Sequence, residues 1–228
     1  MGKSHLKRIA APKTWQILRK NTKYIIKPSP GTHSIPMGMP LSVILKEVLS
    51  HAKTSREVKK VLNTNEIKID GTSRKDFRFQ VGLFDTMELS TGECFRMTIN
   101  KNGKLHLVTV KKDEVNSKPC RIVGKTMVKG KVQLNLYDGN NLLVDKDGYK
   151  VGDTVILSLP DKKITKHLKL DKKSSIFLIG GKHIGETGHV EDISGSKIIY
   201  KDSHGNMIET SKSYAFVVGE AKPLITVE

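Results

Sequence analysis

The sequence predicts an α+β protein that is mostly β and consists of several small modules. From Gly92 onward, short apolar strands alternate with Gly- and Asp-containing turns at a spacing of roughly ten residues, a pattern typical of small β-barrels. Two helical stretches precede these strands. The hydrophobic content of 37% and the aromatic content of 5% lie below the roughly 45–50% apolar of an ordinary domain, which favours small modules over one large core.

The charge is the strongest global feature and is unevenly distributed. The formal net charge is +17, with +8 in residues 1–40, +2 in 41–92, +8 in 93–172 and −1 in 173–228. Such an excess favours a polyanionic partner, because each neutralised phosphate releases condensed counterions. An anionic membrane is the competing partner, but the chain lacks a run of 18 apolar residues and therefore predicts no membrane span.

The first segment, residues 1–40, predicts a basic arm with little fold of its own. No acidic residue precedes Glu47, and breakers are dense: Pro12, Pro28, Pro30, Gly31, Pro36, Gly38 and Pro40. Unpaired positive charge and low hydrophobicity disfavour a packed core, although the short patches 13–20 and 24–27 could be ordered. A transit peptide is also basic and acid-poor, but prolines at this density oppose its long amphipathic helix.

The second segment, residues 41–92, predicts a small α+β domain. The stretch "PLSVILKEVLSHAK" has helical apolar spacing, and Thr54 with Glu57 three residues later predicts a capping box that opens a second helix. "EIKIDG", "FRFQV" and "DTMEL" predict short strands. Cations gather opposite the apolar stripe of the second helix and in the strand and turn that follow: Lys53, Arg56, Lys59, Lys60, Lys68, Arg74, Lys75 and Arg78.

The basic face of the second helix could be an ordinary solvent-exposed face. The cations of the following turn favour instead a positive surface that helix and turn share and that is about as wide as an RNA groove.

The third and fourth segments, residues 93–172 and 173–228, predict β domains. "FRMTINKNGKLHLVTV" predicts a hairpin around Asn102-Gly103, since this dipeptide readily takes positive φ at both turn positions. "KVQLNLYDGNNLLV" predicts a second hairpin at Asp138-Gly139. The central domain carries charge without aromatics, which is typical of contacts that bind phosphates and read no sequence.

Catalytic patterns are weak throughout. His183 and His189 lack a third ligand nearby, which favours loop histidines over a metal site. Asp202-Ser203-His204 are adjacent and cannot face one another as a triad requires. "GGKHIGET" places Glu186 where a phosphate-binding loop needs lysine. Cys94 and Cys120 form no CxxC pair, which suits a reducing compartment. We expect no enzyme, cofactor, metal site or small-molecule substrate.

Three motifs in order resemble a known family. "SHLKRIAAPKTW", the helix pair with "EIKIDG", and "IFLIGGKHIGETGHVEDI" resemble the archaeal and eukaryotic (e-type) ribosomal protein four of the small subunit. The stretch 41–90 resembles the RNA-binding domain named after the bacterial ribosomal protein four. A set of residues in the third motif resembles the KOW motif: Gly181, Lys182, Gly185, Gly188 and Val190. Glu186 departs from that motif, because a basic or polar residue is common at its position.

The resemblance implies a non-enzymatic constituent of the small ribosomal subunit. It would bind and stabilise small-subunit rRNA, touch neighbouring ribosomal proteins, bind no membrane and reside in the cytoplasm. It also implies an rRNA-binding arm and a KOW-containing, SH3-like C-terminal barrel. Trp15 could stack on RNA or pack on the protein, and packing is preferred. Outside the α+β domain, the expected RNA-binding residues are Lys3, His5, Lys7, Arg8, Lys13, Trp15, Arg19, Lys20, Lys111, Lys112, Lys125, Lys129, Lys131, Lys162, Lys163, Lys166 and Lys182.

Two other functions remain open at this point. A transcription or translation factor could be built around the KOW barrel, although it would more often have a neutral or acidic body. An RNA-modifying enzyme could carry the same RNA-binding domain, but the Gly-Arg-Leu-Asp string of a pseudouridine synthase is absent.

Overall fold

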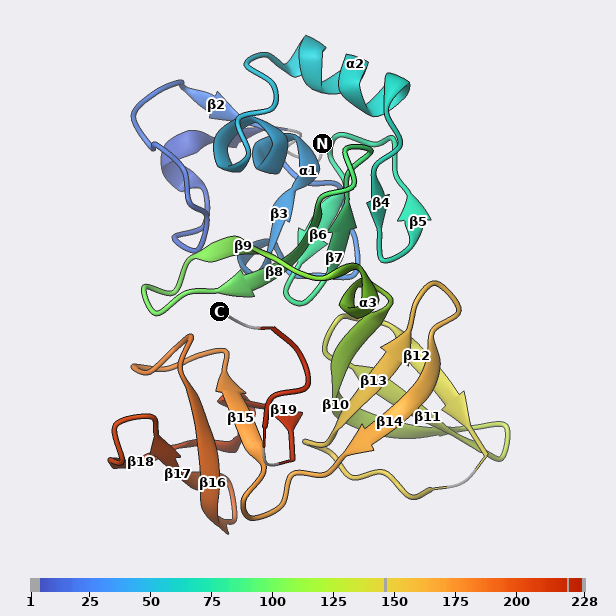
Figure 1. The fold of residues 1–228 in the computed structure, drawn as a ribbon, viewed down its shortest axis with the longest axis vertical. Helices are drawn as coiled ribbons and strands as arrows, with labels where there is room; N and C mark the ends of the chain where they lie inside the picture. Colours follow the sequence, from blue (N-terminus) through green and yellow to red (C-terminus); the bar gives the residue numbers. More distant parts are fainter. Residues whose placement is uncertain (1–4, 146, 221, 227–228) are drawn as a thin grey trace. The chain divides into compact units, whose positions relative to one another are not determined.

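The structure is a computed structural model that describes residues 5–145, 147–220 and 222–226. The chain divides into two compact units. Unit 1 comprises Met1–Thr98 and Lys104–Asn116, and unit 2 comprises Ile99–Gly103 and Ser117–Glu228. Strands dominate both units (Figure 1), so the prediction of a mostly β, α+β protein is confirmed.

Unit 1 is built around a five-stranded sheet with the order β5-β4-β7-β8-β9. Its strands are β4 (Lys68–Ile69), β5 (Thr72–Ser73), β7 (Thr86–Glu88), β8 (Cys94–Ile99) and β9 (Leu105–Thr109). Two small antiparallel pairs add β1 (Leu6–Lys7) to β2 (Tyr24–Ile25) and β3 (Gly38–Pro40) to β6 (Gln80–Gly82). The helical turn α3 (Lys112–Val115) ends the unit.

The helix pair of unit 1 follows the predicted apolar spacing. The first helix begins with α1 (Leu41–Val43) and continues as a π-helical turn (Ile44–Val48), in which Leu49 N donates to Ile44 O at 2.9 Å. It ends several residues before the Lys53 expected from the pattern. The second helix, α2 (Ser55–Thr64), begins at the predicted capping box and buries Val58 and Leu62.

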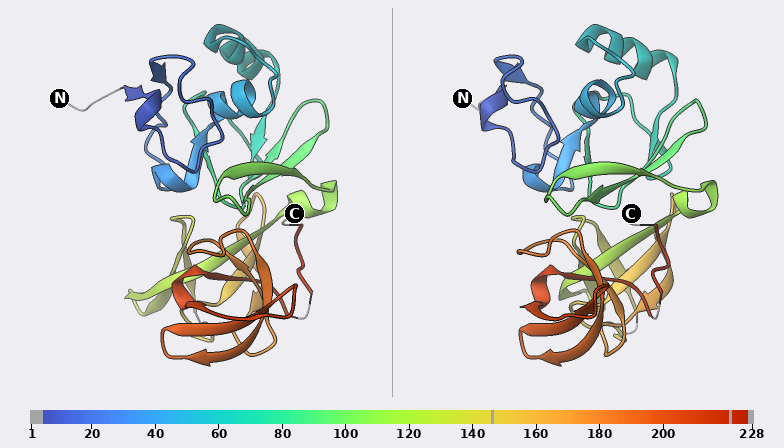
Figure 2. Two further views of the ribbon diagram at one scale, coloured as in Figure 1. Left: turned by 90° about the vertical axis from the view of Figure 1, so that its left-hand side faces the viewer. Right: turned by 60° about the vertical axis from the view of Figure 1, so that its left-hand side comes forward.

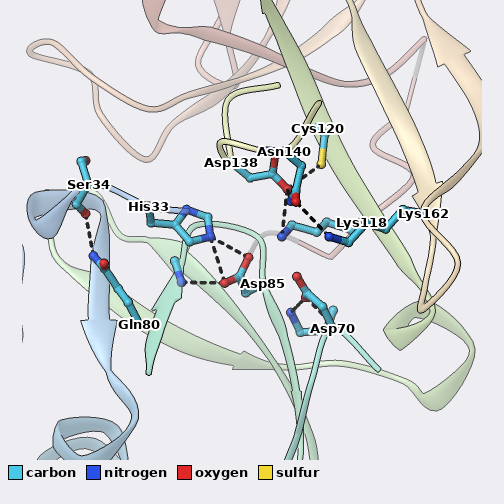
Figure 3. Close-up of polar contacts among 12 residues, drawn as sticks. His33, Ser34, Asp70, Gln80, Asp85, Lys118, Cys120, Asp138, Asn140 and Lys162 are labelled. Carbon is cyan, nitrogen blue, oxygen red and sulfur yellow. Dashed lines mark hydrogen bonds and ion pairs between the residues drawn. The ribbon is translucent and has the colours of Figure 1, made fainter. Parts of the chain in front are cut away.

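Residues 5–40 differ from the expected extended arm. Figure 2 shows in both views that the blue chain up to β3 folds beside the first helix. Trp15 is 1% exposed, and its Nε1 donates to Gly38 O at 2.9 Å. Buried His33 contacts Asp85 at 3.0 Å, and Gly82 N donates to the same carboxylate at 2.8 Å (Figure 3). A few buried anchors thus fold a segment whose composition predicts disorder.

Unit 2 contains two five-stranded antiparallel sheets. The first has the order β12-β11-β10-β13-β14 and the second the order β18-β17-β16-β15-β19. The first sheet contains β10 (Ser117–Val128), β11 (Lys131–Leu136), β12 (Asn141–Val144), β13 (Thr154–Ser158) and β14 (Lys163–Leu168). The second contains β15 (Ser175–Leu178), β16 (Thr187–Ser194), β17 (Lys197–Asp202), β18 (Met207–Ser211) and β19 (Ala215–Gly219). Each sheet contributes a buried cluster to the interior.

Strand β10 is the element that curls the first sheet. Its first half, through Arg121, pairs with β13, and its second half pairs with β11. The register shifts between Ile122 and Gly124, and an extra residue at such a point bends a strand. A single strand therefore belongs to two faces of a half-closed barrel (Figure 1).

The two predicted hairpins form, but one turn differs in detail. β8 neighbours β9 and β11 pairs with β12. At the first turn Gly103 has φ +69°, whereas Asn102 does not have a positive φ. Asn102 N instead donates to Asn100 Oδ1 at 3.0 Å, and Gly103 N donates to Asn100 O at 2.8 Å. The prediction of positive φ at both positions is therefore wrong, because the Asn100 side chain supplies an alternative turn.

Candidate nucleic-acid interface

Most of the described cations that are expected to bind RNA are exposed, several are half-buried, and Arg8 is buried. Lys3 lies outside the described residues. In the segment from residue 5 to residue 40, Lys7, Lys13 and Lys20 are exposed, as is His5, whose ring lies edge-on to Tyr24 at 5.6 Å between centroids. These side chains can reach a partner without rearrangement of the fold.

Arg8 and Arg19 instead hold the chain together. Arg8 is 3% exposed and donates to Glu47 Oε1 at 2.7 Å, to Leu18 O at 2.9 Å and to Thr22 Oγ1 at 3.1 Å. The guanidinium of Arg19 donates to Ala11 O at 2.8 Å and to Pro12 O at 2.7 Å. A guanidinium that is already satisfied by carbonyl and carboxylate oxygens has few donors left for a phosphate. We assign both arginines, together with buried Trp15, to the fold.

Helix α2 presents the clearest unpaired charge. Lys53, Arg56, Lys59 and Lys60 are exposed, and none of them forms an ion pair with any described residue. The helix start is fixed locally, because Glu57 Oε2 accepts from Lys53 N at 2.7 Å and from Thr54 N at 3.3 Å. The backbone N–H of Lys53, followed by Thr54, lowers the pKa of Glu57, so this carboxylate stays ionised within the cap.

The turn region next to α2 supports the helix cations with aromatic rings. Lys59 Nζ lies 4.8 Å from the centroid of the Phe77 ring, and the guanidinium carbon of Arg74 lies 4.6 Å from that of Phe79. Arg78 Nε donates to Lys27 O at 3.1 Å. Lys75 is exposed, and Lys68 is half-buried in β4. The contact between Lys59 and Phe77 joins the helix to the turn region that carries Arg74 and Arg78.

In unit 2 several expected contacts have acidic neighbours. Lys125 contacts Asp147, Lys131 contacts Asp145 at 2.8 Å, and Lys163 lies 3.7 Å from Asp161. The Asp145 carboxylate raises the pKa of Lys131 through a hydrogen bond and its charge. Exposed pairs such as those of Lys131 and Lys163 are weak, so these two lysines can exchange a carboxylate for a phosphate at small cost. Lys125 is half-buried, and its Nζ also donates to Tyr149 O at 2.6 Å.

Other expected cations of unit 2, Lys129 and Lys166, are exposed. Lys166 also lines a cavity of about 590 Å³ with His167, Glu220 and Lys222. Lys162 Nζ donates to Asn140 Oδ1 at 2.8 Å (Figure 3). Lys111 and Lys112, which belong to unit 1, are exposed as well.

The KOW-like loop joins β15 to β16. Gly181 and Gly185 have φ +85° and +80°, conformations that side chains rarely adopt. Glu186 Oε2 lies 3.0 Å from His183 Nδ1, so the residue that departs from the KOW pattern has a partner inside the loop. Lys182 is exposed beside it.

Among the cations that sequence reasoning did not single out are Arg96, Lys118, Arg121 and Lys23. Arg96 and Lys118 are buried and Arg121 is half-buried; burial lowers the pKa of both arginines. Lys23 is exposed, and its Nζ lies 5.5 Å from the Tyr24 ring. Lys23 lies in the same acid-free segment as Lys7, Lys13 and Lys20, so the sequence could have identified it. The burial of Arg96, Lys118 and Arg121 depends on tertiary contacts and could not be read from the sequence.

Among the described residues, no group of three or more His, Cys, Asp and Glu side chains could hold a metal ion. Within the same residues, every helix is too short or too polar to cross a membrane.

Two family models match parts of the chain. The model of the ribosomal family S4e matches residues 91–164, and that of the RS4NT domain matches residues 1–36. The small ribosomal subunit protein eS4 of Methanocella arvoryzae is 40% identical over 230 residues, which cover 97% of each chain. Its counterpart from Staphylothermus marinus is 39% identical over 98% of this chain and 95% of its own.

A solved structure is also similar. The crystal structure of the 30S ribosomal protein S4e from Thermoplasma acidophilum superposes with a TM-score of 0.71 at 28% identity, over 81% of this chain and 96% of that one.

Proposed function

This chain belongs to the ribosomal S4e family and is a structural, non-enzymatic constituent of the small ribosomal subunit, and we propose that two basic surfaces of unit 1 hold it on small-subunit rRNA. The first, the arm surface, consists of Lys7, Lys13, Lys20 and Lys23. The second, the helix surface, consists of Lys53, Arg56, Lys59, Lys60 and Lys75. Unit 2 adds scattered contacts through Lys129, Lys162, Lys163, Lys166 and Lys182.

The observation that supports this proposal is the distribution of unpaired charge. The cations of both surfaces are exposed, and no acidic residue from His5 to Lys46 interrupts those of the arm surface. Carboxylates in this stretch would repel phosphates, whereas lysines release the counterions that phosphates hold. A resident of the ribosome gains from such permanent electrostatic attraction.

The mode of RNA binding follows from the chemistry of the two surfaces. A-form RNA closes its deep groove to side chains and presents phosphates and 2′-hydroxyls across the shallow one. Lysines with flexible stems suit these contacts and discriminate little between sequences. The protein therefore stabilises rRNA by shape and charge, acts in the cytoplasm where ribosomes translate, and lies beside other small-subunit proteins.

Removing the whole arm is a poor test, because Trp15 and His33 anchor it inside unit 1. The better variant replaces Lys7, Lys13 and Lys20 with Gln in the full chain. Binding to transcripts of small-subunit rRNA and to an unrelated RNA of equal length is measured over a salt series. Loss of three phosphate contacts lowers the log–log salt slope by roughly 2 to 3 in magnitude, at about 0.7–0.9 for each contact.

The matched control replaces three exposed lysines of the nearly neutral C-terminal region, Lys173, Lys201 and Lys222, with Gln. We expect its slope to equal that of the wild type. Equal affinity of the wild type for both RNAs at every salt concentration contradicts the proposed function. An equal loss of slope in the two triple variants contradicts the arm surface alone.

A further inference from the structure

Exposed apolar side chains in unit 1 are confined to the basic arm. Among the described residues of this unit, the exposed large hydrophobic side chains are Ile9, Leu18, Tyr24 and Ile35. The remainder of the unit buries or half-buries its large apolar side chains, although it carries the sheet and both helices. Single exposed apolar residues are ordinary, but their restriction to the segment without acidic residues calls for a physical reason.

Ile9 and Leu18 are the most exposed of the four, at 78% and 72%. Neither can be explained as a side chain that seals the local core. Each leaves most of its aliphatic surface in water.

The internal arginines hold the two backbones that carry these side chains. Arg8 donates to Leu18 O at 2.9 Å, and Arg19 donates to Ile9 O at 3.3 Å and to Ala11 O at 2.8 Å. Arg8 N also donates to Lys23 O at 3.0 Å. The turn around residue 9 and the turn around residue 18 are therefore cross-linked by reciprocal bonds. A side chain on a rigid turn loses less conformational entropy when it binds.

The charge around these turns selects the partner. Lys7, Lys13, Lys20 and Lys23 are exposed on the same segment, and the described residues from 5 to 46 include no carboxylate. A surface of this charge is complementary to a polyanion. Aliphatic side chains within it then need apolar patches on that polyanion, and RNA supplies these on ribose edges in its shallow groove and on the faces of unstacked bases.

We propose that Ile9 and Leu18 form an apolar anchor that packs on ribose or base surfaces of rRNA, between the phosphates that the arm lysines contact. This inference rests on the proposed function and adds an apolar contribution to rRNA affinity, which charge does not provide. Burial of aliphatic surface is independent of counterion release. The anchor should therefore contribute affinity that persists at high salt, where the lysine contacts fade.

The test is a salt series with the full chain carrying Ile9→Ala and Leu18→Ala together, against small-subunit rRNA transcripts. If both side chains are buried on RNA, the double variant binds about tenfold or more weakly at every salt concentration, with the slope unchanged. The arm-lysine triple variant should show the opposite behaviour, a shallower slope. Separate changes of intercept and slope distinguish apolar from electrostatic contacts.

Two further variants sharpen the test. Ile9→Lys adds a cation, so it strengthens binding if charge alone matters and weakens binding if the apolar contact exists. Leu143→Ala together with Met207→Ala truncates side chains of similar exposure in unit 2, at 61% and 71%, and should leave rRNA affinity unchanged. All these side chains are exposed, so unfolding midpoints in urea should stay near the wild-type value.

The anchor is overturned if Ile9→Ala/Leu18→Ala binds rRNA as the wild type does, or if Leu143→Ala/Met207→Ala loses as much affinity. Retained rRNA binding with a lost contact to a neighbouring small-subunit protein also overturns it and identifies a protein interface. A wild type without preference for rRNA removes the proposed function and the anchor together. If the wild type prefers rRNA and the Ile9→Ala/Leu18→Ala variant binds rRNA with the same affinity, the proposed function stands and the anchor alone is overturned.

Discussion

Asp138 shows how one residue can organise the interior of a small β domain. Its carboxylate lies 3.3 Å from Lys118 Nζ and accepts from Asn140 Nδ2 at 2.6 Å, with Cys120 Sγ at 3.5 Å (Figure 3). Both charged side chains of the pair are 4% exposed. A buried ion pair need not add net stability, but removing one member leaves the other charge uncompensated.

We expect Asp138→Asn to lower the free energy of unfolding by about 3 kcal/mol or more, because the substitution neutralises a buried carboxylate that lies 3.3 Å from the ammonium of buried Lys118. Urea denaturation followed by circular dichroism measures the change. The matched control is Asp145→Asn, which breaks the exposed pair with Lys131 and should cost less than about 1 kcal/mol. Equal costs for the two variants would show that Lys118 finds another partner or solvent.

Tyr200 provides a test of burial by pH. Desolvation raises the pKa of its hydroxyl to about 12 from 10.0, and the charges of Glu186 and Asp202 act in the same direction. The unfolded chain therefore loses this proton at lower pH than the folded chain. The stabilisation is complete below pH 10 and is lost as the pH rises from about 10 through about 12.

Absorbance titration of the phenol groups should show a tyrosine that ionises near pH 12 and that is missing from Tyr200→Phe. Between pH 10 and 12, the stability of the wild type should fall relative to this variant by about 2 to 3 kcal/mol. A constant difference between the two proteins over this range would place the hydroxyl in water.

At the scale of elements, α2 owes its start to local contacts. Thr54 Oγ1 accepts from Glu57 N at 3.2 Å, and Glu57 returns bonds to the backbone of Thr54 and Lys53. Every group in this cap lies within five residues of the others, so the sequence pattern was sufficient to predict it. Strand β10 is the contrasting case. It pairs with β11, which follows it directly, and also with the more distant β13, where Ser117 lies opposite Ser158. No local motif near Ser117 predicts the second pairing.

Thr54→Ala should destabilise unit 1 by about 1 kcal/mol, because an orphan N–H at the helix start loses its acceptor. Thr64→Ala at the exposed end of the same helix is the control and should change the urea midpoint little. Equal shifts for the two threonines would mean that the cap is not formed in solution.

At the scale of the whole molecule, the arm is part of unit 1 through Trp15 and its bonds to the β3 region. We expect Trp15→Ala to lower the stability of unit 1 by about 3 to 5 kcal/mol, the usual cost of emptying a site of this size. Hydrogen exchange read by mass spectrometry separates peptides of the two units. Faster exchange should appear across unit 1, including the first helix and β6.

Trp15→Phe, which keeps most of the buried volume, should give a smaller change at the same peptides. Unaltered exchange in Trp15→Ala would indicate that the arm detaches from unit 1 in solution. A detached arm would also release Arg8 and Arg19 for phosphate contacts and would weaken the case for a rigid apolar anchor.

The sequence alone predicts the fold class, the helix pair with its capping box and most strands, and its charge favours a polyanionic partner. These features depend on local spacing, turn residues and summed charge, which do not require knowledge of the fold. Tertiary structure alone decided which cations remain available. Arg8 looks like an RNA contact in the linear sequence, yet the distant Glu47 accepts from its guanidinium, and Gly38 O accepts from Trp15 Nε1. Burial is a property of contacts between residues far apart in the chain, so composition cannot reveal it.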